Sequence, residues 1–252
     1  MTMYDPTADT LPPLRGRHWP WLFFTAALML LGACALLGAR AYAGLPDSVP
    51  THWGADGLPD EFSAKSIGTV FMPLFIGAAV VVFLAFLAVV LGAMLPSDPE
   101  ASAWKSIGRI AMIRSTAMLM GLIGLGIVTV VSDGFLAGIH GGISMPMWPL
   151  AIGSALLLPL ALLLYWLGAR WGRARAAELG LAPSDDEARE DALWISGILY
   201  NDPADPAILV PQRSGMGSGS TINVGHRTGK LIAIGFVVIM SAFVLSMALI
   251  PS

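Results

Sequence analysis

The chain has 252 residues, of which 56% are hydrophobic and only 12% are charged, with a net charge of −3. Soluble domains carry about 25% charged residues, so this composition is typical of a protein that crosses a membrane several times. The absence of a basic tract argues against a nucleic-acid partner. The single cysteine, Cys34, excludes an internal disulfide and a thiolate metal cluster, and we expect it to face lipid or a neighbouring helix.

The first apolar run follows a polar tail over residues 1–18, which we expect to lie in the cytoplasm. Trp19–Ala39 carries no charge, and its 21 residues are enough to cross about 30 Å of hydrocarbon. The competing interpretation is a cleaved signal peptide, because Ala41-Tyr-Ala43 resembles a cleavage site. The apolar run is longer than that of a usual signal peptide, so we expect a retained helix.

Four more apolar runs follow, and we expect membrane spans at Ile67–Leu95, Ile107–Val131, Pro146–Leu167 and Leu231–Ile250. A charged link that contains Lys105, Arg109 and Arg114 leads into the third span, and a Gly-rich loop, Asp133–Met145, leaves it. The predicted domains are a tail (1–18), a four-helix membrane region (19–168) with an outward loop (44–66), a cytoplasmic segment (169–229) and a fifth transmembrane helix (230–252).

The basic residues divide unequally between the two sides of these five spans. One side holds twelve of the fourteen, namely Arg15, Arg17, Lys105, Arg109, Arg114, Arg170, Arg173, Arg175, Arg189, Arg213, Arg227 and Lys230. The other side holds Arg40 and Lys65. Cytoplasmic loops are enriched in Lys and Arg, so we expect the N-terminus inside and the C-terminus outside.

The middles of the predicted spans contain no Asp, Glu, Lys, Arg or His. Ionisable groups inside a membrane usually mark ion paths or catalysis, so their absence argues against an ion-coupled transporter acting alone and against an intramembrane aspartyl protease. The chain also lacks the P-loop, zinc-protease and serine-hydrolase motifs. The run Gly215–Gly219 has no suitably placed Lys and is interpreted as a flexible turn. We predict no catalytic residue and no cofactor.

The outward loop, Leu45–Lys65, has the composition of a segment with a defined shape. Its acidic residues outnumber the basic ones, with Asp47, Asp56, Asp60 and Glu61 against Lys65. Its prolines are Pro46, Pro50 and Pro59, and Gly54 and Gly57 provide turns. We expect this loop to cap the helices and to be the main recognition surface.

The loop resembles the outward segment of the SdpI-type bacterial membrane proteins. The residues that carry the resemblance are Leu45, Pro46, Val49, Pro50, Thr51, His52, Trp53, Gly57, Asp60, Lys65 and Pro73. The family is known from bacteriocin immunity, in which a membrane protein protects its producer from a secreted peptide, and one member sequesters a repressor at the membrane. The resemblance implies a location in the bacterial cytoplasmic membrane and a ligand- or partner-binding loop made by Pro50, Thr51, His52, Trp53, Asp56, Gly57, Asp60 and Lys65.

A second segment resembles a small module of related uncharacterised bacterial membrane proteins. Its residues are Trp194, Tyr200, Asn201, Asp202, Asp205, Pro206 and Asn223. Short β-like runs separated by Asn-Asp-Pro and Asp-Pro turns predict a small cytoplasmic β-hairpin within residues 194–224. Trp194 and Tyr200 are suited either to contact with a cytoplasmic regulator or to packing against each other. We expect the preceding acidic stretch, Ser184–Asp191, to be a solvated helix and nothing more.

His52 allows two interpretations. It is either a metal ligand together with Asp56, Asp60, Glu61 and His140, or a structural histidine that is hydrogen-bonded to the loop backbone. We expect the structural role and no metal site.

The predicted fold is an all-α integral membrane protein with five transmembrane helices, a structured extracytoplasmic loop and a small cytoplasmic β-hairpin-like element. The function that we expect is non-enzymatic and of immunity, sensing or regulatory type. Its expected partners are the lipid bilayer, a secreted peptide or a larger membrane complex, and a cytoplasmic regulator. The alternatives are an accessory subunit of a membrane transporter or envelope complex, and an outward-facing metal-dependent hydrolase.

Overall fold

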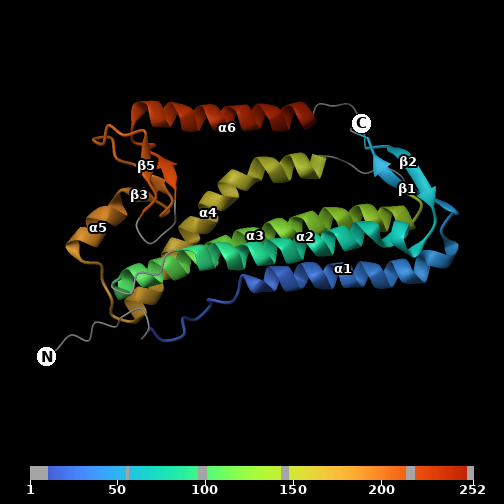
Figure 1. Cartoon of the computed structure of the whole chain (residues 1–252), viewed down its shortest axis with the longest axis horizontal. Helices are drawn as coiled ribbons and strands as arrows, with labels where there is room; N and C mark the ends of the chain where they lie inside the picture. Colours follow the sequence, from blue (N-terminus) through green and yellow to red (C-terminus); the bar gives the residue numbers. More distant parts are fainter. Residues whose placement is uncertain (1–10, 55–56, 96–100, 143–147, 214–218, 249–252) are drawn as a thin grey trace. The chain divides into compact units, whose positions relative to one another are not determined.

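The computed structural model describes residues 11–54, 57–95, 101–142, 148–213 and 219–248. Figure 1 shows its helices and strands in chain order. The chain divides into two compact units. The hairpin unit comprises residues 21–86, 120–157 and 240–252, and the β-module unit comprises residues 1–20, 87–119 and 158–239. The boundary between them passes through four helices, so each unit contains parts of those helices.

The hairpin unit begins with helix α1 (Trp21–Ala41) and a short 3₁₀ turn, η2 (Tyr42–Gly44). Strands β1 (Ser48–Trp53) and β2 (Pro59–Ala64) follow, and helix α2 (Ile67–Met94) begins directly after them. The unit also contains the C-terminal part of helix α3 (Ala103–Ile139) and the start of α4 (Trp148–Glu178).

Small residues and aromatic rings bring α1, α2 and α3 together in the hairpin unit. A Cβ atom added at Gly38 of α1 would lie 2.5 Å from the ring of Phe135, so only glycine allows this close approach. The Phe135 ring in turn contacts that of Phe71, with the ring centroids 5.9 Å apart. Cys34 of α1 is 1% exposed. It therefore lies in the protein interior and does not face lipid.

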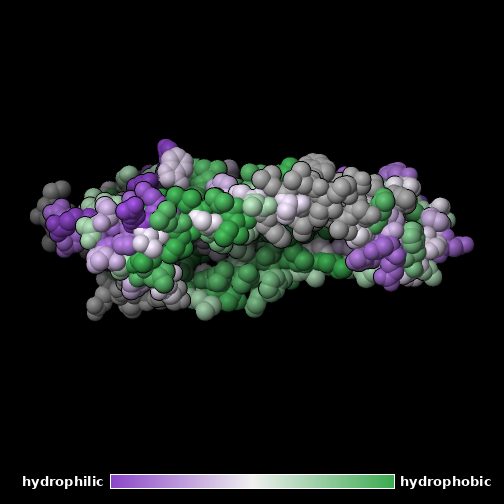
Figure 2. Space-filling view, turned by 90° about the horizontal axis from the view of Figure 1, so that it is seen from above, coloured by the Kyte–Doolittle hydropathy of each residue, from purple (hydrophilic) through white to green (hydrophobic). Residues whose placement is uncertain are grey.

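Four helices in the described part of the chain are long and apolar enough to cross a membrane: Trp21–Gly44, Ile67–Met94, Ala103–Ile139 and Ile152–Glu178. Only 11–28% of the residues in their most apolar windows are buried within the protein, so most of these apolar side chains are exposed, as suits helices that cross a membrane. The surface in Figure 2 is accordingly hydrophobic along the helices and hydrophilic over the β1–β2 hairpin. This part of the predicted fold is confirmed: the chain is mostly helical, with several helices that can span a membrane.

Helix α3 is longer than the predicted third span. It runs without interruption over 37 residues, which at 1.5 Å per residue is about 55 Å and exceeds the thickness of the hydrocarbon. The predicted charged link and the predicted Gly-rich loop were therefore wrong where they overlap Ala103–Ile139. No proline occurs within this range, and isolated charged residues such as Arg109 and Asp133 do not end a helix.

Helix α4 continues to Glu178, ten residues beyond the predicted end of the four-helix region at residue 168. Helix α6 (Arg227–Ala248) covers most of the predicted fifth span. It is a helix as predicted, but its crossing of the membrane and the N-in/C-out orientation stay predictions. The Gly215–Gly219 turn lies outside the described residues except for Gly219.

In the β-module unit, α3 and α4 pack through small residues. A Cβ atom added at Gly168 would lie 1.8 Å from Ser115 Oγ, and one at Gly172 would lie 3.0 Å from the Ala111 methyl group. The Ser115 hydroxyl, which is 1% exposed, donates to the Ala111 carbonyl group of its own helix and also approaches the Leu164 carbonyl oxygen of α4 at 3.3 Å. These contacts fix the two helices at close distance.

The β module (residues 194–224) contains two small antiparallel sheets. Strands β3 (Trp194–Ile195) and β4 (Leu199–Tyr200) form one, and β5 (Leu209–Pro211) and β6 (Ser220–Ile222) form the other. A parallel bridge between Tyr200 and Asn223 joins them. The predicted β element is confirmed, and it has more strands than the single hairpin that was expected. Helix α5 (Asp185–Ala192) precedes it and begins with a capping box at Ser184.

Candidate functional site

The loop over Leu45–Lys65 forms an antiparallel β-hairpin in which β1 pairs with β2. At its tip, the Gly54 N–H group donates to the Leu58 carbonyl group at 2.9 Å, and Gly57 has a positive φ of 75° that favours glycine. The register is irregular on both sides of His52, which bulges the first strand. The prediction of a shaped loop is confirmed, and its shape is a hairpin.

Lys65 closes the base of the hairpin. Its ammonium group donates to the Leu45 carbonyl oxygen at 2.7 Å, lies 4.0 Å from an Asp47 carboxylate oxygen and lies 5.6 Å from the centroid of the Tyr42 ring. The Lys65 backbone N–H group also donates to the Asp47 carbonyl group. The side chain of Lys65 is only 19% exposed, so it joins the two ends of the loop and does not project from it.

The exposed face of the hairpin carries an ion pair between the two strands. His52 Nδ1 lies 2.6 Å from Asp60 Oδ1, and both side chains are more than half exposed. The hydrogen bond and the negative charge of Asp60 raise the pKa of His52 above its ordinary value. His52 thus makes this hydrogen bond to a side chain, whereas a hydrogen bond to the loop backbone was expected.

The described residues contain no cluster of three or more His, Cys, Asp or Glu side chains that could hold a metal ion. Asp56, one of the predicted ligands, lies outside the described residues. His140 lies in the turn after α3, and its ring Nδ1 is 2.7 Å from the Leu136 carbonyl oxygen.

An apolar cavity of about 120 Å³ lies beneath the hairpin. The hairpin contributes Val49, Pro50 and Trp53 to its lining. Helices α2 and α3 contribute the rest, including Val70, Pro73, Val131, Gly134, Phe135, Gly138 and Ile139. The walls are mainly aliphatic and aromatic, so the cavity suits an apolar group and not an ion.

Four of the eight predicted loop residues thus lie in two separate pairs. Pro50 and Trp53 line the cavity, whereas His52 and Asp60 pair on the exposed face. Thr51 lies between, with its hydroxyl 3.3 Å from that of Ser63 on β2. Sequence reasoning missed the contributions of Phe135 and Ile139, because only the fold brings the end of α3 beneath a loop some 80 residues earlier in the chain.

Asn223 is the centre of the β module. Its side chain is completely buried, and its amide oxygen accepts hydrogen bonds from the backbone N–H groups of Asp202, Gly225 and His226. Its amide nitrogen donates to the carbonyl groups of Asp202, Asp205 and Ala207. Asn223 therefore has six backbone partners, and the two hydrogens of its amide group are shared among the three carbonyl groups.

The other predicted module residues are placed around this centre. The rings of Trp194 and Tyr200 pack edge to face with their centroids 5.3 Å apart, so these two side chains contact each other. Burial and the nearby carboxylates of Asp202 and Asp205 raise the pKa of Tyr200. Asn201 and Pro206 are exposed and make the accessible part of the predicted set.

Helix α5 is more than a solvated helix, which corrects the prediction. Glu187 accepts a hydrogen bond from the hydroxyl group of Ser102, and Glu190 lies 3.8 Å from the Lys105 ammonium group. Burial opposes ionisation of Glu187, but the hydrogen bonds from Ser102 and Ser184 outweigh it and lower the pKa of Glu187. The acidic side chains of α5 therefore bind the beginning of α3.

Residues 19–77 match a domain of unknown function, DUF1648. This range contains α1, the β1–β2 hairpin and the first turns of α2. No curated protein and no solved structure matches the chain. The match covers less than a quarter of the chain, and the resemblance to the SdpI-type proteins stays a prediction. What the comparison adds is that α1, the hairpin and the first turns of α2 are matched by one family model.

Proposed function

We propose that this protein is a non-enzymatic membrane protein of immunity, sensing or regulatory type whose β1–β2 hairpin binds a cationic, amphipathic peptide on the outer side of the membrane. The observation that carries the proposal is an apolar cavity beneath an acidic hairpin. The cavity offers Trp53 and Phe135 to an apolar side chain. In this proposal the β module on the cytoplasmic side tethers or relays to a regulator.

Charge complementarity supports a cationic partner. The acidic residues Asp47, Asp60 and Glu61 in the described part of the loop are all exposed. The side chain of Lys65 instead points into the base of the hairpin. Acidic groups on the hairpin that covers an apolar pocket favour a ligand with basic residues beside an apolar face, because attraction between opposite charges speeds encounter and burial of the apolar face holds the complex.

The proposal is tested by photo-crosslinking in the membranes of the cells that make the protein. Trp53 is replaced by the photoreactive residue p-benzoylphenylalanine, which keeps an aromatic side chain in the cavity. The matched control carries the same residue at Leu28 of α1, a helix position that is 44% exposed. The expected result is a crosslink from position 53, and not from position 28, to a peptide with basic residues on one side and apolar residues on the other.

A second pair of changes tests the role of charge. Asp60→Asn combined with Glu61→Gln should reduce the yield of that crosslink, because it removes two of the exposed acidic groups of the hairpin. Equal crosslinks from positions 53 and 28, or a yield that does not depend on Asp60 and Glu61, would contradict the proposal. A crosslink from position 53 to a large membrane protein would contradict it as well and would favour the accessory-subunit alternative.

A further inference from the structure

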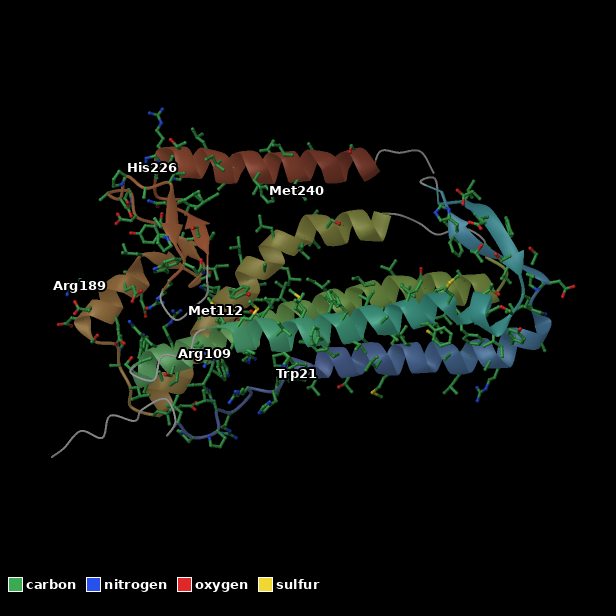
Figure 3. All side chains as sticks on the ribbon, viewed as in Figure 1. Trp21, Arg109, Met112, Arg189, His226 and Met240 are labelled. Carbon is green, nitrogen blue, oxygen red and sulfur yellow. The ribbon has the colours of Figure 1, made fainter. Side chains whose placement is uncertain are left out.

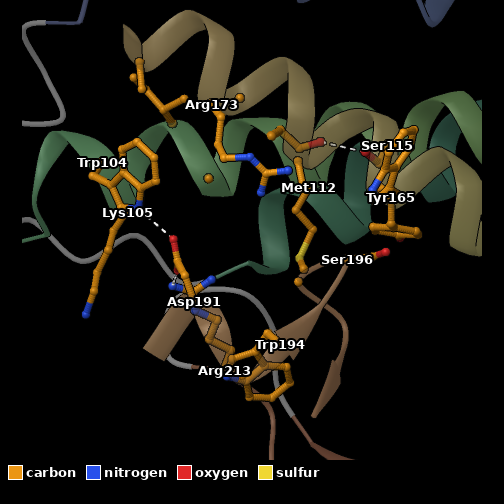
Figure 4. Close-up of a pocket in the computed structure, with 18 residues that line it drawn as sticks. Trp104, Lys105, Met112, Ser115, Tyr165, Arg173, Asp191, Trp194, Ser196 and Arg213 are labelled. Carbon is orange, nitrogen blue, oxygen red and sulfur yellow. Dashed lines mark hydrogen bonds and ion pairs between the residues drawn. The ribbon is translucent and has the colours of Figure 1, made fainter. Parts of the chain in front are cut away.

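The β-module unit contains a second cavity of about 120 Å³, lined by α3, α4, α5 and the β module (Figure 4). It differs from the cavity beneath the hairpin because charged and aromatic side chains line it together. Its charged lining residues are Lys105, Arg173, Asp191 and Arg213. Three of these four are basic, on the side of the protein that is predicted to be cytoplasmic.

Most of this charge is already neutralised. Arg213 is 8% exposed and forms ion pairs with Asp191 and Glu190, and the Lys105 ammonium group lies 3.8 Å from Glu190. Arg173 differs from them: it has no ion pair, hydrogen bond or ring contact with any residue in the described ranges. The cavity therefore has one cation, Arg173, that is exposed to solvent and has no acidic partner among the described residues.

Arg173 extends from α4 into the cavity, with Trp104 on one side and Met112 and Tyr165 on the other (Figure 4). A guanidinium group offers several N–H donors in one plane, which suits the oxygen atoms of a phosphate group. The apolar and aromatic walls suit a hydrocarbon or ring that is attached to that phosphate group.

The neighbouring side chains include Arg and Trp residues of the kind that lie at the surface of a membrane. The Arg170 guanidinium group lies 4.7 Å from the centroid of the Trp166 ring, and that of Arg114 lies 5.0 Å from the centroid of the Trp171 ring. Trp and Arg residues at the ends of apolar helices gather at the level of lipid headgroups. This location brings phosphate groups with apolar chains close to the cavity.

We propose that this cavity binds the phosphate group of an amphiphile, with Arg173 as its cationic anchor. Two sources supply that chemistry: the headgroup of an anionic phospholipid, and a soluble phosphate ester. The proposal is independent of peptide binding at the hairpin, since it uses none of the same residues.

The test measures lipid binding by native mass spectrometry of the full-length protein after removal of copurified lipid. The probes are dihexanoyl phosphatidylglycerol, dihexanoyl phosphatidylcholine and inorganic phosphate. The variants are Arg173→Gln and, as the matched control, Arg189→Gln, which removes one positive charge from an exposed position on α5 (Figure 3). The first bound phosphatidylglycerol should lose roughly tenfold or more in affinity in Arg173→Gln, because a charge-assisted hydrogen bond is lost. Arg189→Gln should bind as the wild type does.

Competition identifies the source. If inorganic phosphate leaves the bound phosphatidylglycerol in place, the ligand is a lipid headgroup, and if it displaces the lipid at comparable concentration, the ligand is a soluble phosphate ester. Equal affinity of Arg173→Gln and Arg189→Gln would overturn the proposal. If Arg173→Gln does not fold, the wild-type protein decides alone: it should bind the anionic lipid several-fold more tightly than the zwitterionic one, and equal binding of the two lipids overturns the proposal.

Discussion

The indole N–H group of Trp104 donates a hydrogen bond to the carboxylate of Asp191 over 3.0 Å, which joins two residues that are 87 positions apart. The same carboxylate accepts a hydrogen bond from the guanidinium group of Arg213, whose side chain is 8% exposed. The carboxylate of Asp191, at the end of α5, thus binds both the start of α3 and the β module.

Removing the charge of Asp191 should therefore destabilise the protein. Asp191→Asn keeps the size of the side chain, and Glu190, at 3.5 Å, is then the acidic partner that the buried Arg213 keeps among the described residues. We expect a loss of about 1–3 kcal/mol in the free energy of unfolding, measured as thermal unfolding in detergent. The matched control is Asp186→Asn on the same helix, because Asp186 and its partner Arg189 are both at least three-quarters exposed. The control should show no measurable change, and equal destabilisation of the two variants would disprove this role for Asp191.

The contact between His52 and Asp60 should depend on pH. The pKa of His52 in the folded protein is raised above the ordinary value of 6.5. The contact is therefore fully present below that ordinary value and weakens as the pH rises through the raised pKa. Asp60→Asn should lower the pKa of His52, which an NMR titration of its ring proton reports. Asp47→Asn, the control, removes another hairpin carboxylate and should leave the pKa of His52 where it is. A pKa that does not change in Asp60→Asn would show that the two side chains are not paired in solution.

Asn223 should be among the least replaceable residues of the β module. Asn223→Ala removes the partner of six backbone groups in a buried site, and we expect a loss of at least about 3 kcal/mol, because each unsatisfied buried group costs about 1–3 kcal/mol. Asn223→Asp keeps the acceptor but turns a carboxylate oxygen toward three carbonyl groups, so it should also destabilise the module. The control, Asn201→Ala, changes an exposed side chain and should be nearly neutral. Limited proteolysis of the β module measures all three variants, and similar cleavage rates for Asn223→Ala and Asn201→Ala would contradict the prediction.

The close contact of α3 and α4 should be sensitive to a single methyl group at Gly168. Gly168→Ala introduces a Cβ atom 1.8 Å from Ser115 Oγ, and overpacking of this kind costs about 1–3 kcal/mol. Gly153→Ala, in the same helix, has nothing within 4 Å of the added atom and should be neutral or stabilising. Thermal unfolding in detergent compares the two. Combining Gly168→Ala with Ser115→Ala should recover part of the lost stability. If no stability is recovered, the added methyl group does not clash with Ser115.

The helices were predictable because apolar runs of sufficient length admit few other structures in a membrane. The boundaries were less predictable, as α3 shows: Lys105, Arg109 and Arg114 suggested a link, yet charged residues at a membrane surface can continue a helix. The strands of the hairpin were not predicted either, because several of their residues have a low β-strand propensity. Pro50, Pro59 and Asp60 are residue types that strands usually avoid, and their pairing follows from the turn and from the contact of Lys65 with the base.

The two cavities could not be predicted from the sequence for a physical reason. Each is lined by residues from segments far apart in the chain, such as Trp53 with Phe135, or Trp104 with Arg213. No local sequence pattern predicts that these residues lie close together, because their proximity depends on how the helices pack. Asn223 was found by resemblance, and its role became clear only from its six backbone partners.

The position of Asn223 also has a consequence for the order of events during synthesis. Its partners lie in residues 202–226, and two of them, Gly225 and His226, immediately precede α6. The ribosome releases the chain from the N-terminus, so the β module can close only when α6 is about to emerge. A growing chain that ends before residue 223 exposes unpaired backbone groups that proteases can reach. Helix α6 therefore follows a module whose hydrogen-bonding partners have all been synthesised before the helix itself.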